Sequence, residues 1–241
     1  MSKANIIEIF SSVQGEGKYL GCRQIFVRLA DCNLNCVYCD TNFTRADFCK
    51  VETAAGSMNF RNEKNPLDAA QVAELIKNFA GEVPTQAVSF TGGEPLLHWQ
   101  FIGDVAGAIK NLGLKIFLET NGTFHNEFEK ISGAVDIVSM DIKLGQNLFA
   151  LHEKFLRAAQ KKDLYVKIVV TGETPREEFL SAVDLIASVD KEILLIVQPV
   201  TPVKEICAAS AEKILSFQAA ALRKLKNVRV IPQTHKIINL L

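Results

Sequence analysis

"DAAQVAELIKNFAGEVPTQAVSFT" (residues 68–91) changes its hydrophobic period part-way along, and this change decides the fold. Its first half repeats apolar residues at helical spacing, namely Val72, Leu75, Ile76 and Phe79. This stripe predicts an amphipathic helix, with Asp68 as its N-cap and Gly81 as its stop. The segment "AVSFT" (87–91) is short and apolar, which indicates a buried strand. The stretch therefore predicts one helix followed by one strand.

The same alternation continues toward the C-terminus. Further helices are expected at residues 101–113, 125–131, 148–160, 174–189 and 210–225. Further strands are expected at residues 25–29, 114–120, 135–142, 164–170, 193–199 and 228–232. At the start of the helix over 174–189, Thr174, Pro175 and Glu177 predict a capping box.

Strands that are joined through helices pair in parallel, because each connection must cross back over the sheet. Their near-continuous apolar sequences indicate that both faces of the sheet are covered. An eight-unit barrel takes about 250 residues, and here about six units precede the terminal strand. The sequence therefore predicts an α/β fold, an incomplete (β/α)6-type parallel barrel, in a single domain over 1–241. The stretch 44–66 is polar and irregular, and we expect an insertion or a lid there.

Composition and charge limit the class of protein. Of the 241 residues, 48% are apolar and 22% are charged, as in ordinary globular proteins, and the formal net charge is zero. The lack of a basic excess argues against a nucleic-acid partner. No apolar run is long enough for a signal peptide or a membrane span, so we expect a cytoplasmic protein with no membrane partner. In a reducing cytosol, clustered cysteines indicate metal binding rather than disulfides.

Half of the six cysteines lie together in "FVRLADCNLNCVYCDT" (26–41). Cys32, Cys36 and Cys39 form a C-x3-C-x2-C loop just beyond the strand expected at 25–29. Structural zinc sites and electron-transfer clusters normally take four protein ligands, so three thiolates leave one metal position open. The pattern predicts a [4Fe–4S] cluster with one iron free for another ligand.

Two other interpretations of this loop are open. A zinc site could recruit Cys49 or a nearby histidine as its fourth ligand. The three thiols could also be unrelated buried side chains. The remaining cysteines, Cys22, Cys49 and Cys207, have no partner spacing and are expected to be plain small residues.

A second motif, "SFTGGEP" (89–95), lies at the end of another expected strand. Its two glycines allow a backbone to approach a ligand closely, and Glu94 offers two acceptor oxygens for an ammonium group. By itself the motif favours a tight turn before a helix that begins at Pro95. Its position downstream of the cysteine loop, in a parallel α/β chain, favours a ligand site.

The cysteine loop, the "GGEP" turn and the six-unit partial barrel together resemble the radical S-adenosylmethionine (SAM) superfamily, over the whole chain. The resemblance implies that the free iron binds the amino and carboxylate groups of SAM. One electron from the cluster then cleaves the sulfonium to a 5′-deoxyadenosyl radical, which abstracts a hydrogen atom. The resemblance implies SAM contacts at Tyr38, Cys39, Asp40, Gly93, Glu94, Ser139, Asp141 and Lys143. For the last three, ordinary polar strand ends are the other interpretation.

Three further segments narrow the resemblance: "FSSVQGEG" (10–17), "CDT" (39–41) and "PQTHK" (232–236). They resemble the 7-carboxy-7-deazaguanine synthase family of queuosine and 7-deazapurine biosynthesis. The resemblance implies conversion of 6-carboxy-5,6,7,8-tetrahydropterin to 7-carboxy-7-deazaguanine with loss of ammonia. It also implies a Mg²⁺ ion at Thr41, a homodimer and a flavodoxin-like electron donor. The implied substrate contacts are Val13, Gln14, Gly15, Glu16, Arg28, Thr91, His235 and Lys236.

Two of these residues have a clear chemical reason. Arg28 suits a bidentate clamp on a carboxylate better than Lys would. The carboxylate of Glu16 can accept a pair of N–H bonds from a guanidine-like ring edge. Taken singly, each segment has a structural explanation: "VQGEG" as a plain loop, Arg28 as a surface residue and Thr41 as an N-cap.

Two other functions stay open on the sequence. A radical SAM activase of a glycyl-radical or anaerobic reductase enzyme would carry the same cysteine loop but would need an open site for a partner protein. A non-catalytic metal-binding module would need four-coordinate metal and no pocket. The orientation of Arg28 separates the activase from the pterin enzyme, because the pterin enzyme needs Arg28 to point into the barrel mouth. Some relatives end in a proline that reaches the active site, and here the last residue is Leu241.

Overall fold

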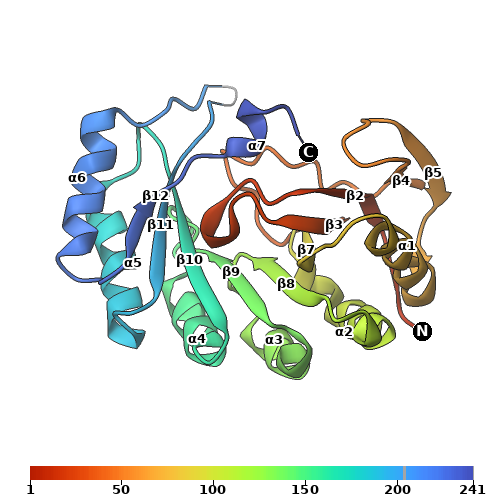
Figure 1. Ribbon diagram of the computed structural model, residues 1–241. Coiled ribbons are helices and arrows are strands. Elements are labelled where there is room, and N and C mark those ends of the chain that lie inside the picture. Colours follow the sequence, from red (N-terminus) through yellow and green to blue (C-terminus); the bar gives the residue numbers. More distant parts are fainter. Residues whose placement is uncertain (203–204, 241) are drawn as a thin grey trace.

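The computed structural model describes residues 1–202 and 205–240. Its main feature is one curved sheet in which ten strands follow the order β12-β11-β10-β9-β8-β7-β3-β2-β4-β5 (Figure 1). Seven of these strands run in parallel. They are β3 (Arg23–Leu29), β7 (Ala87–Gly92), β8 (Lys115–Thr120), β9 (Ile137–Asp141), β10 (Asp163–Val170), β11 (Leu194–Pro199) and β12 (Val228–Val230). Among the described residues β12 and β5 do not pair, so the expected open, incomplete barrel is confirmed.

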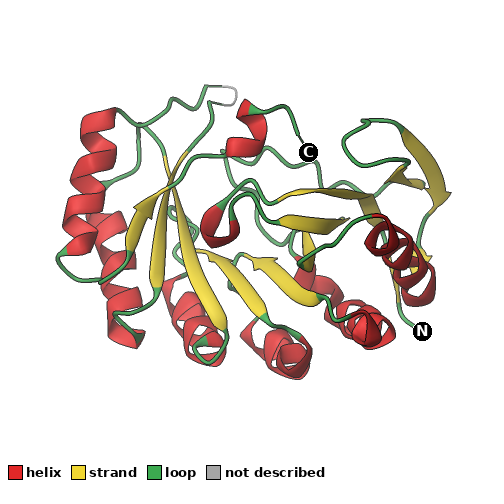
Figure 2. Cartoon of the chain, in the orientation of Figure 1, coloured by secondary structure: helices red, strands yellow, loops and turns green. Residues whose placement is uncertain are grey.

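Helices cover the outer, convex face of the parallel strands (Figure 2). They are α1 (Ala69–Glu82), α2 (Trp99–Ile109), α3 (His125–Ile131), α4 (Phe149–Ala159), α5 (Arg176–Val189) and α6 (Ala211–Leu222). Between helices and sheet lies the main hydrophobic core, which includes Phe90, Phe101, Phe128, Phe155 and Phe179. Within 1–202 and 205–240, every helix is too short or too polar to cross a membrane.

Helix ends follow the sequence in part. Asp68 caps α1 as expected, and the cap is a full capping box in which Asp68 and Gln71 bond each other's backbone N–H. Gly81 was expected to stop α1, but it lies inside the helix, which ends when Val83 turns extended. Gly113 does end the second helical segment, because it adopts the left-handed conformation, with φ 68°.

The capping box expected at Thr174 is wrong. The N-cap of α5 is Pro175, and it makes no side-chain cap bond. The Thr174 hydroxyl instead accepts the backbone N–H of Thr171, at 2.8 Å, and closes the turn after β10. A hydroxyl two residues before a helix can serve either turn, and local sequence does not decide between them.

The sheet continues beyond β3 through strands that the sequence did not predict. β2 (Ile6–Val13) pairs antiparallel with β3, and β4 (Phe48–Glu52) pairs with β2 and with β5 (Phe60–Lys64). The stretch 44–66 is therefore a β-hairpin on the sheet edge rather than an irregular segment. A separate two-stranded sheet joins β1 (Lys3–Ala4) to β6 (Leu67–Asp68). The described residues also contain four 3-10 turns, η1 (Gly17–Tyr19), η2 (Pro95–His98), η3 (Lys110–Leu112) and η4 (Ser132–Ala134), and the short helix α7 (Thr234–Ile237).

The loop between β2 and β3 folds back inside the curve of the sheet, where its turn η1 is seen in red in Figure 1. Gly17 in this turn has φ 66°, and a Cβ there would meet the ring of Tyr165 at 2.4 Å. Tyr19 packs edge-on against Phe117. The turn thus fills the end of the barrel where the strands begin, and a glycine is required for it to pack so closely.

Candidate active site

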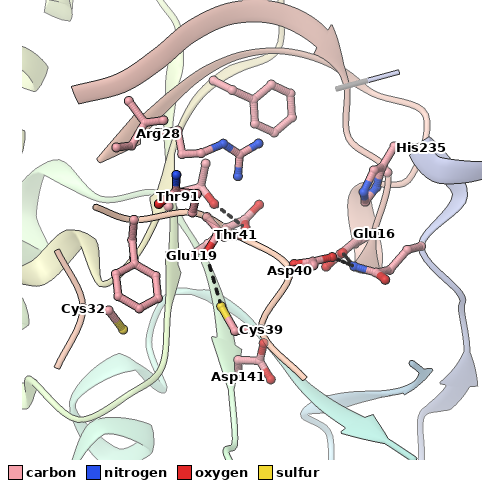
Figure 3. Close-up of a pocket in the computed structure, with 18 of the residues that line it drawn as sticks. Glu16, Arg28, Cys32, Cys39, Asp40, Thr41, Thr91, Glu119, Asp141 and His235 are labelled. Atoms are coloured by element: carbon pink, nitrogen blue, oxygen red, sulfur yellow. Dashed lines mark hydrogen bonds between the residues drawn. The ribbon is translucent and has the colours of Figure 1, made fainter. Parts of the chain in front are cut away.

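A cavity of about 710 Å³ opens inside the curve of the sheet, above this turn (Figure 3). It is lined from both ends of the chain, by the loops after β2 and β3, by the inner faces of β8 to β11 and by the C-terminal segment. Figure 3 shows Arg28 and Thr91 on one side of it, and Glu16 and His235 on the other. Such a volume suits a small-molecule substrate and a cofactor together.

The inner face of the barrel changes character along each strand. Apolar side chains form a small buried cluster near the strand starts: Ala87, Phe117, Ile137, Tyr165, Leu194 and Ile196. Two residues further along four of these strands, a polar side chain lines the cavity: Glu119, Ser139, Lys167 and Gln198. Because side chains alternate between the faces of a strand, a spacing of two keeps both on the inner face. We call these the apolar layer and the polar layer.

The three cysteines of the loop after β3 all line this cavity and are half-buried free thiols. Burial raises the pKa of the Cys32 and Cys36 thiols. Within the described residues, no three His, Cys, Asp or Glu side chains converge as a single metal ion requires. Each thiolate of a [4Fe–4S] cluster binds a separate iron, so the three thiols on one loop fit a cluster. Cys49 is buried in β4 and does not line the cavity, which rules it out as the fourth ligand of the zinc interpretation.

The two glycines of "GGEP" let the cysteine loop pack against β7. A Cβ on Gly92, whose φ is 117°, would meet the backbone oxygen of Leu29 at 2.2 Å, and a Cβ on Gly93 would meet that of Asp31 at 1.8 Å. The backbone N–H groups of Gly93 and Glu94 donate to the same two oxygens. Gly93 also lines the cavity. The motif therefore anchors the cysteine loop as well as bordering the ligand space.

Glu94 does not take the position expected of an ammonium ligand. Its carboxylate is fully buried, outside the cavity lining, and accepts the N–H of Leu96, the hydroxyl of Thr120 and the N–H of Asn121. Burial raises its pKa to about 7 although these hydrogen bonds oppose the shift. The Asn121 amide in turn donates to Asn33 in the cysteine loop, at 2.8 Å. Glu94 is thus connected to the cysteine loop indirectly, by hydrogen bonds through Asn121 in the turn after β8.

The side chains expected around SAM otherwise line the cavity: Tyr38, Cys39, Asp40, Gly93, Ser139, Asp141 and Lys143. Four buried atoms of cavity residues lack a hydrogen-bond partner within the described chain: the hydroxyls of Tyr38 and Ser139, Oδ1 of Asp141 and Oε1 of Gln198. Buried polar atoms are normally satisfied. Oxygens left free around one cavity fit a polar ligand such as SAM. Lys143 donates to Oδ2 of Asp141 at 2.8 Å and lies 5.6 Å from the Tyr38 ring centre.

The loop after β2 places Gln14 and Glu16 in the cavity wall. The Gln14 amide donates to Glu119, at 3.0 Å, and its oxygen accepts the N–H of Glu16. The Glu16 carboxylate accepts bonds from the Lys167 ammonium and from the Gln233 amide. Burial opposes its ionisation, but the Lys167 charge and these hydrogen bonds lower its pKa to about 2. Glu16 is therefore an anchored anion.

Arg28 points into the cavity from β3, together with the cysteines (Figure 3). Its Nε donates to Glu8, at 2.7 Å, and the guanidinium lies 5.6 Å from the Phe10 ring centre. This bond uses Nε, so the terminal nitrogens remain as donors for a carboxylate. Arg28 therefore has the orientation expected of a small-molecule site rather than of an activase site. Thr91, on β7, donates to Glu119 at 2.9 Å.

The C-terminal segment closes the cavity from the side. Thr234 donates through its N–H and its hydroxyl to the backbone oxygen of Gly15, at 2.9 and 3.0 Å. His235 packs on Gly15, where a Cβ would meet its ring at 2.2 Å. Lys236 pairs with Asp40, and Gln233 reaches the same carboxylate at 3.2 Å. These bonds join the loop after β2 to the loop that carries the cysteines.

The structure brings all the expected residues to one cavity except Glu94. Val13 and Thr41 line it as well. Sequence reasoning did not single out several other cavity residues, among them Glu119, Lys167, Gln198 and Gln233. The first three could have been found from their inward alternation with Phe117, Tyr165 and Ile196. Leu240 lines the cavity, whereas Leu241, whose reach into the site was left open, lies outside the described residues.

Comparison with known proteins identifies close relatives. A model of the radical SAM superfamily matches residues 27–201. A 7-carboxy-7-deazaguanine synthase from Geobacter sulfurreducens is 39% identical and covers 99% of both chains. One from Methanocaldococcus jannaschii is 38% identical and covers 98% of this chain and 100% of its own. In structure, QueE from Escherichia coli superposes with a TM-score of 0.62 at 19% identity, over 97% of this chain and 95% of that one, which is a likeness of fold.

Proposed function

Because the chain belongs to the radical SAM superfamily and, within it, to the 7-carboxy-7-deazaguanine synthase family, we propose that it converts 6-carboxy-5,6,7,8-tetrahydropterin to 7-carboxy-7-deazaguanine, releasing ammonia. The observation that carries the proposal is one cavity lined by Cys32, Cys36 and Cys39 and also by Glu16 and Arg28. A bound cluster and SAM supply a carbon radical that abstracts a hydrogen atom. The residues of the chain bind, orient and enclose what reacts with it.

On the substrate side, the charges complement a carboxylated pterin. The free donors of Arg28 suit the substrate carboxylate, and the anchored carboxylate of Glu16 suits the N–H groups of the pyrimidine edge. Gln14 and Thr91 both donate hydrogen bonds to Glu119, so these three side chains form one hydrogen-bonded set. Val13, Gly15, His235 and Lys236 complete the wall. A substrate held at both ends has a fixed pose, which a radical reaction needs because a small misplacement costs about a hundredfold in rate.

On the cofactor side, Tyr38, Ser139 and Asp141 line the cavity, and each carries a buried oxygen without a partner among the described residues. Gly93 borders the cavity, and Lys143 holds Asp141 in place. Asp40 belongs to the same wall, but its carboxylate is engaged by Lys236 and Gln233. Glu94 supports the cysteine loop through its hydrogen bond with Asn121 and does not contact SAM.

The magnesium site is part of the proposal. Thr41 lines the cavity two residues after Cys39, and Mg²⁺ accepts few protein ligands while keeping several waters and substrate oxygens. Thr41→Ala should then lose the response of turnover to added Mg²⁺ while SAM binding persists. If the natural protein turns over equally fast before and after exhaustive chelation, the metal assignment is wrong and Thr41 has only a structural role.

We also propose that residues 1–241 act as one domain in which the 44–66 hairpin borders the site. Thr44, Ala46, Phe48 and Lys50 all line the cavity, which supports a lid at its mouth. A homodimer and a flavodoxin-like electron donor are further expectations from the family. Sedimentation equilibrium and reduction of the cluster by a purified flavodoxin test them.

One experiment decides the function. Anaerobic protein with a reconstituted cluster is incubated with carboxytetrahydropterin, SAM, a reductant and Mg²⁺, and the product and ammonia are measured. We expect 7-carboxy-7-deazaguanine, one ammonia per product, and 5′-deoxyadenosine. No pterin turnover, together with radical formation on an added partner protein, would favour the activase function instead.

A further inference from the structure

A buried ammonium lies in the polar layer, and its part in substrate recognition is not yet assigned. Lys167, on β10, is 6% exposed and lines the cavity at mid-depth, two residues after Tyr165. Its Nζ donates to Oε2 of Glu16 and lies 4.0 Å from Oδ2 of Asp141. A lysine in such a position is rarely buried unless it is paired.

The surroundings commit this ammonium to Glu16. Oδ2 of Asp141 already accepts Lys143, at 2.8 Å, whereas Lys167 stays beyond hydrogen-bond distance. Glu119 also faces the cavity, where Gln14 and Thr91 each donate to one of its oxygens. Among the described residues, the carboxylate that Lys167 bonds is that of Glu16 alone.

Glu16 is held from two sides of the cavity. Lys167 bonds Oε2 from the sheet, and Gln233 bonds Oε1 from the C-terminal segment, at 2.9 Å. Each carboxylate oxygen can accept two hydrogen bonds. One bond to each oxygen therefore fixes the plane of the carboxylate and leaves one acceptor position per oxygen for a ligand.

A buried ion pair is weak evidence for stability, because the cost of removing two charges from water offsets their attraction. A pair in a cavity wall, with acceptor capacity left over, is better explained by recognition. The low pKa of Glu16 agrees with a carboxylate that stays ionised throughout the working range.

We propose that Lys167 is a positioning residue, which fixes the Glu16 carboxylate so that its two oxygens accept the paired N–H groups of the aminopyrimidinone edge of the pterin. The inference rests on the proposed function, since it assigns one edge of that substrate. Lys167 acts through Glu16 and makes no contact with the pterin itself. The relevant chemistry is a planar pair of N–H donors meeting a planar pair of acceptors.

The test measures binding rather than turnover. 6-Carboxypterin, a stable and fluorescent oxidised form of the substrate, is titrated into anaerobic, cluster-loaded protein without SAM. Lys167→Met should weaken its affinity at least tenfold, and Lys167→Arg, which keeps the charge and the donors, should recover most of the loss. Lys18→Met is the matched control, because Lys18 pairs with Asp163 on the same strand but does not line the cavity. Its affinity should equal that of the natural protein.

A double-mutant cycle separates positioning from direct contact. If Lys167 acts through Glu16, the variant carrying Lys167→Met and Glu16→Gln should bind no more weakly than Glu16→Gln alone. Additive losses would overturn the proposal, and so would an unchanged affinity of Lys167→Met. Lys167→Gln, which removes the charge but keeps a donor, gives the same answer should the Met variant not fold. If the natural protein itself fails to bind 6-carboxypterin, the proposed substrate is wrong, a result distinct from failure of the Lys167 inference alone.

Discussion

The apolar and polar layers of the barrel interior lie on the same strands and the same face, two residues apart, yet they differ in almost every physical respect. Phe117, Ile137 and Tyr165 are buried against each other and against the turn η1. Ser139 and Lys167 are buried and Glu119 is partly buried, but all three line a cavity and carry a charge or an unpaired oxygen. One layer closes the barrel and the other keeps it open for ligands.

The difference teaches where stability and function reside. Burying an aromatic side chain stabilises the fold by its area, whereas burying charges and unpaired oxygens costs free energy unless a ligand satisfies them. Changes in the apolar layer should therefore lower the free energy of unfolding. Changes in the polar layer, and in the cysteine loop above it, should lower binding or turnover and leave the fold in place.

The largest effect is expected in the cysteine loop. Replacing Cys32, Cys36 or Cys39 by Ala should remove the cluster and all turnover, because three thiolates are the complete set of protein ligands in this loop. Iron and sulfide analysis of each variant checks this. The thermal midpoint of the metal-free protein should stay close to that of the natural chain, since the thiols are only half-buried.

Cys49→Ala is the control for these variants, because Cys49 lies in β4 outside the cavity. It should keep full iron and sulfide. A full cluster in any of the three loop variants would mean that the altered thiol is not a ligand.

The reverse pattern is expected for the apolar layer. Phe117→Ala should lower the free energy of unfolding by about 3–5 kcal/mol, as for large-to-small changes in other buried cores. Phe117 is fully buried and contacts the rings of Tyr19 and Tyr165 edge-on. Urea unfolding of the metal-free protein measures the change, with Phe117→Leu as a milder partner. A cost below about 1 kcal/mol would mean that this layer can collapse around the gap and is not rigid.

Arg28→Ala should produce a smaller loss, confined to substrate binding. Removing a charge-assisted hydrogen bond to a carboxylate costs about 1.5–3 kcal/mol, which is roughly a ten- to hundredfold weaker affinity. Titration of 6-carboxypterin checks this, and cluster iron should be unchanged. Glu8→Gln serves as control for loss of the internal pair, at 2.7 Å, while the guanidinium stays. If both variants bind the pterin equally weakly, Arg28 acts through its orientation by Glu8 rather than as a direct clamp.

Much of this fold could be predicted from the sequence because its signals are local. The helical stripe of α1, the capping residue Asp68 and the apolar strands β7 to β11 depend on nearest neighbours along the chain. The antiparallel strand β2 and the 44–66 hairpin were missed although β2 pairs with the next strand, β3, and β4 pairs with the next strand, β5. Of these pairings, the one between β2 and β4 spans a long stretch of chain. An edge hairpin with polar side chains resembles a loop when only its own residues are considered.

The site divides in the same way. Cysteine spacing and the "GGEP" turn are compact motifs, so they place Cys32, Cys36, Cys39 and Gly93 without coordinates. Glu94 belongs to such a motif, but its role depends on Thr120 and Asn121, which come from another strand end. Lys167 was missed because β10 was interpreted as uniformly apolar, although it alternates between the lumen and the outer core. Alternation within a buried strand is the signal that could have found it.

The last and smallest effect concerns a polar group outside both layers. His152, on α4, is fully buried, and burial lowers its pKa to about 4. Its Nε2 lies 3.1 Å from the backbone oxygen of Asn121, which can only accept, so Nε2 carries the proton. Nδ1 has no partner within the described residues, and protonating it would bury an unsatisfied charged donor.

The sign of the pH effect follows from the two protonation states. The unfolded chain protonates this histidine below its ordinary pKa of 6.5, whereas the native chain resists protonation until about 4. The native protein should therefore lose stability as the pH falls from 6.5 toward 4. Burial of Glu94, whose pKa is raised to about 7, acts in the opposite direction, so the natural protein alone cannot separate the two.

His152→Gln keeps a donor for Asn121 without titrating. Relative to this variant, the natural chain should lose roughly 1–2 kcal/mol between pH 6.5 and pH 5. A stability difference that does not change with pH would mean that His152 takes up its proton as readily in the native state as in the unfolded chain, and that the outer core tolerates a cation which the apolar layer could not.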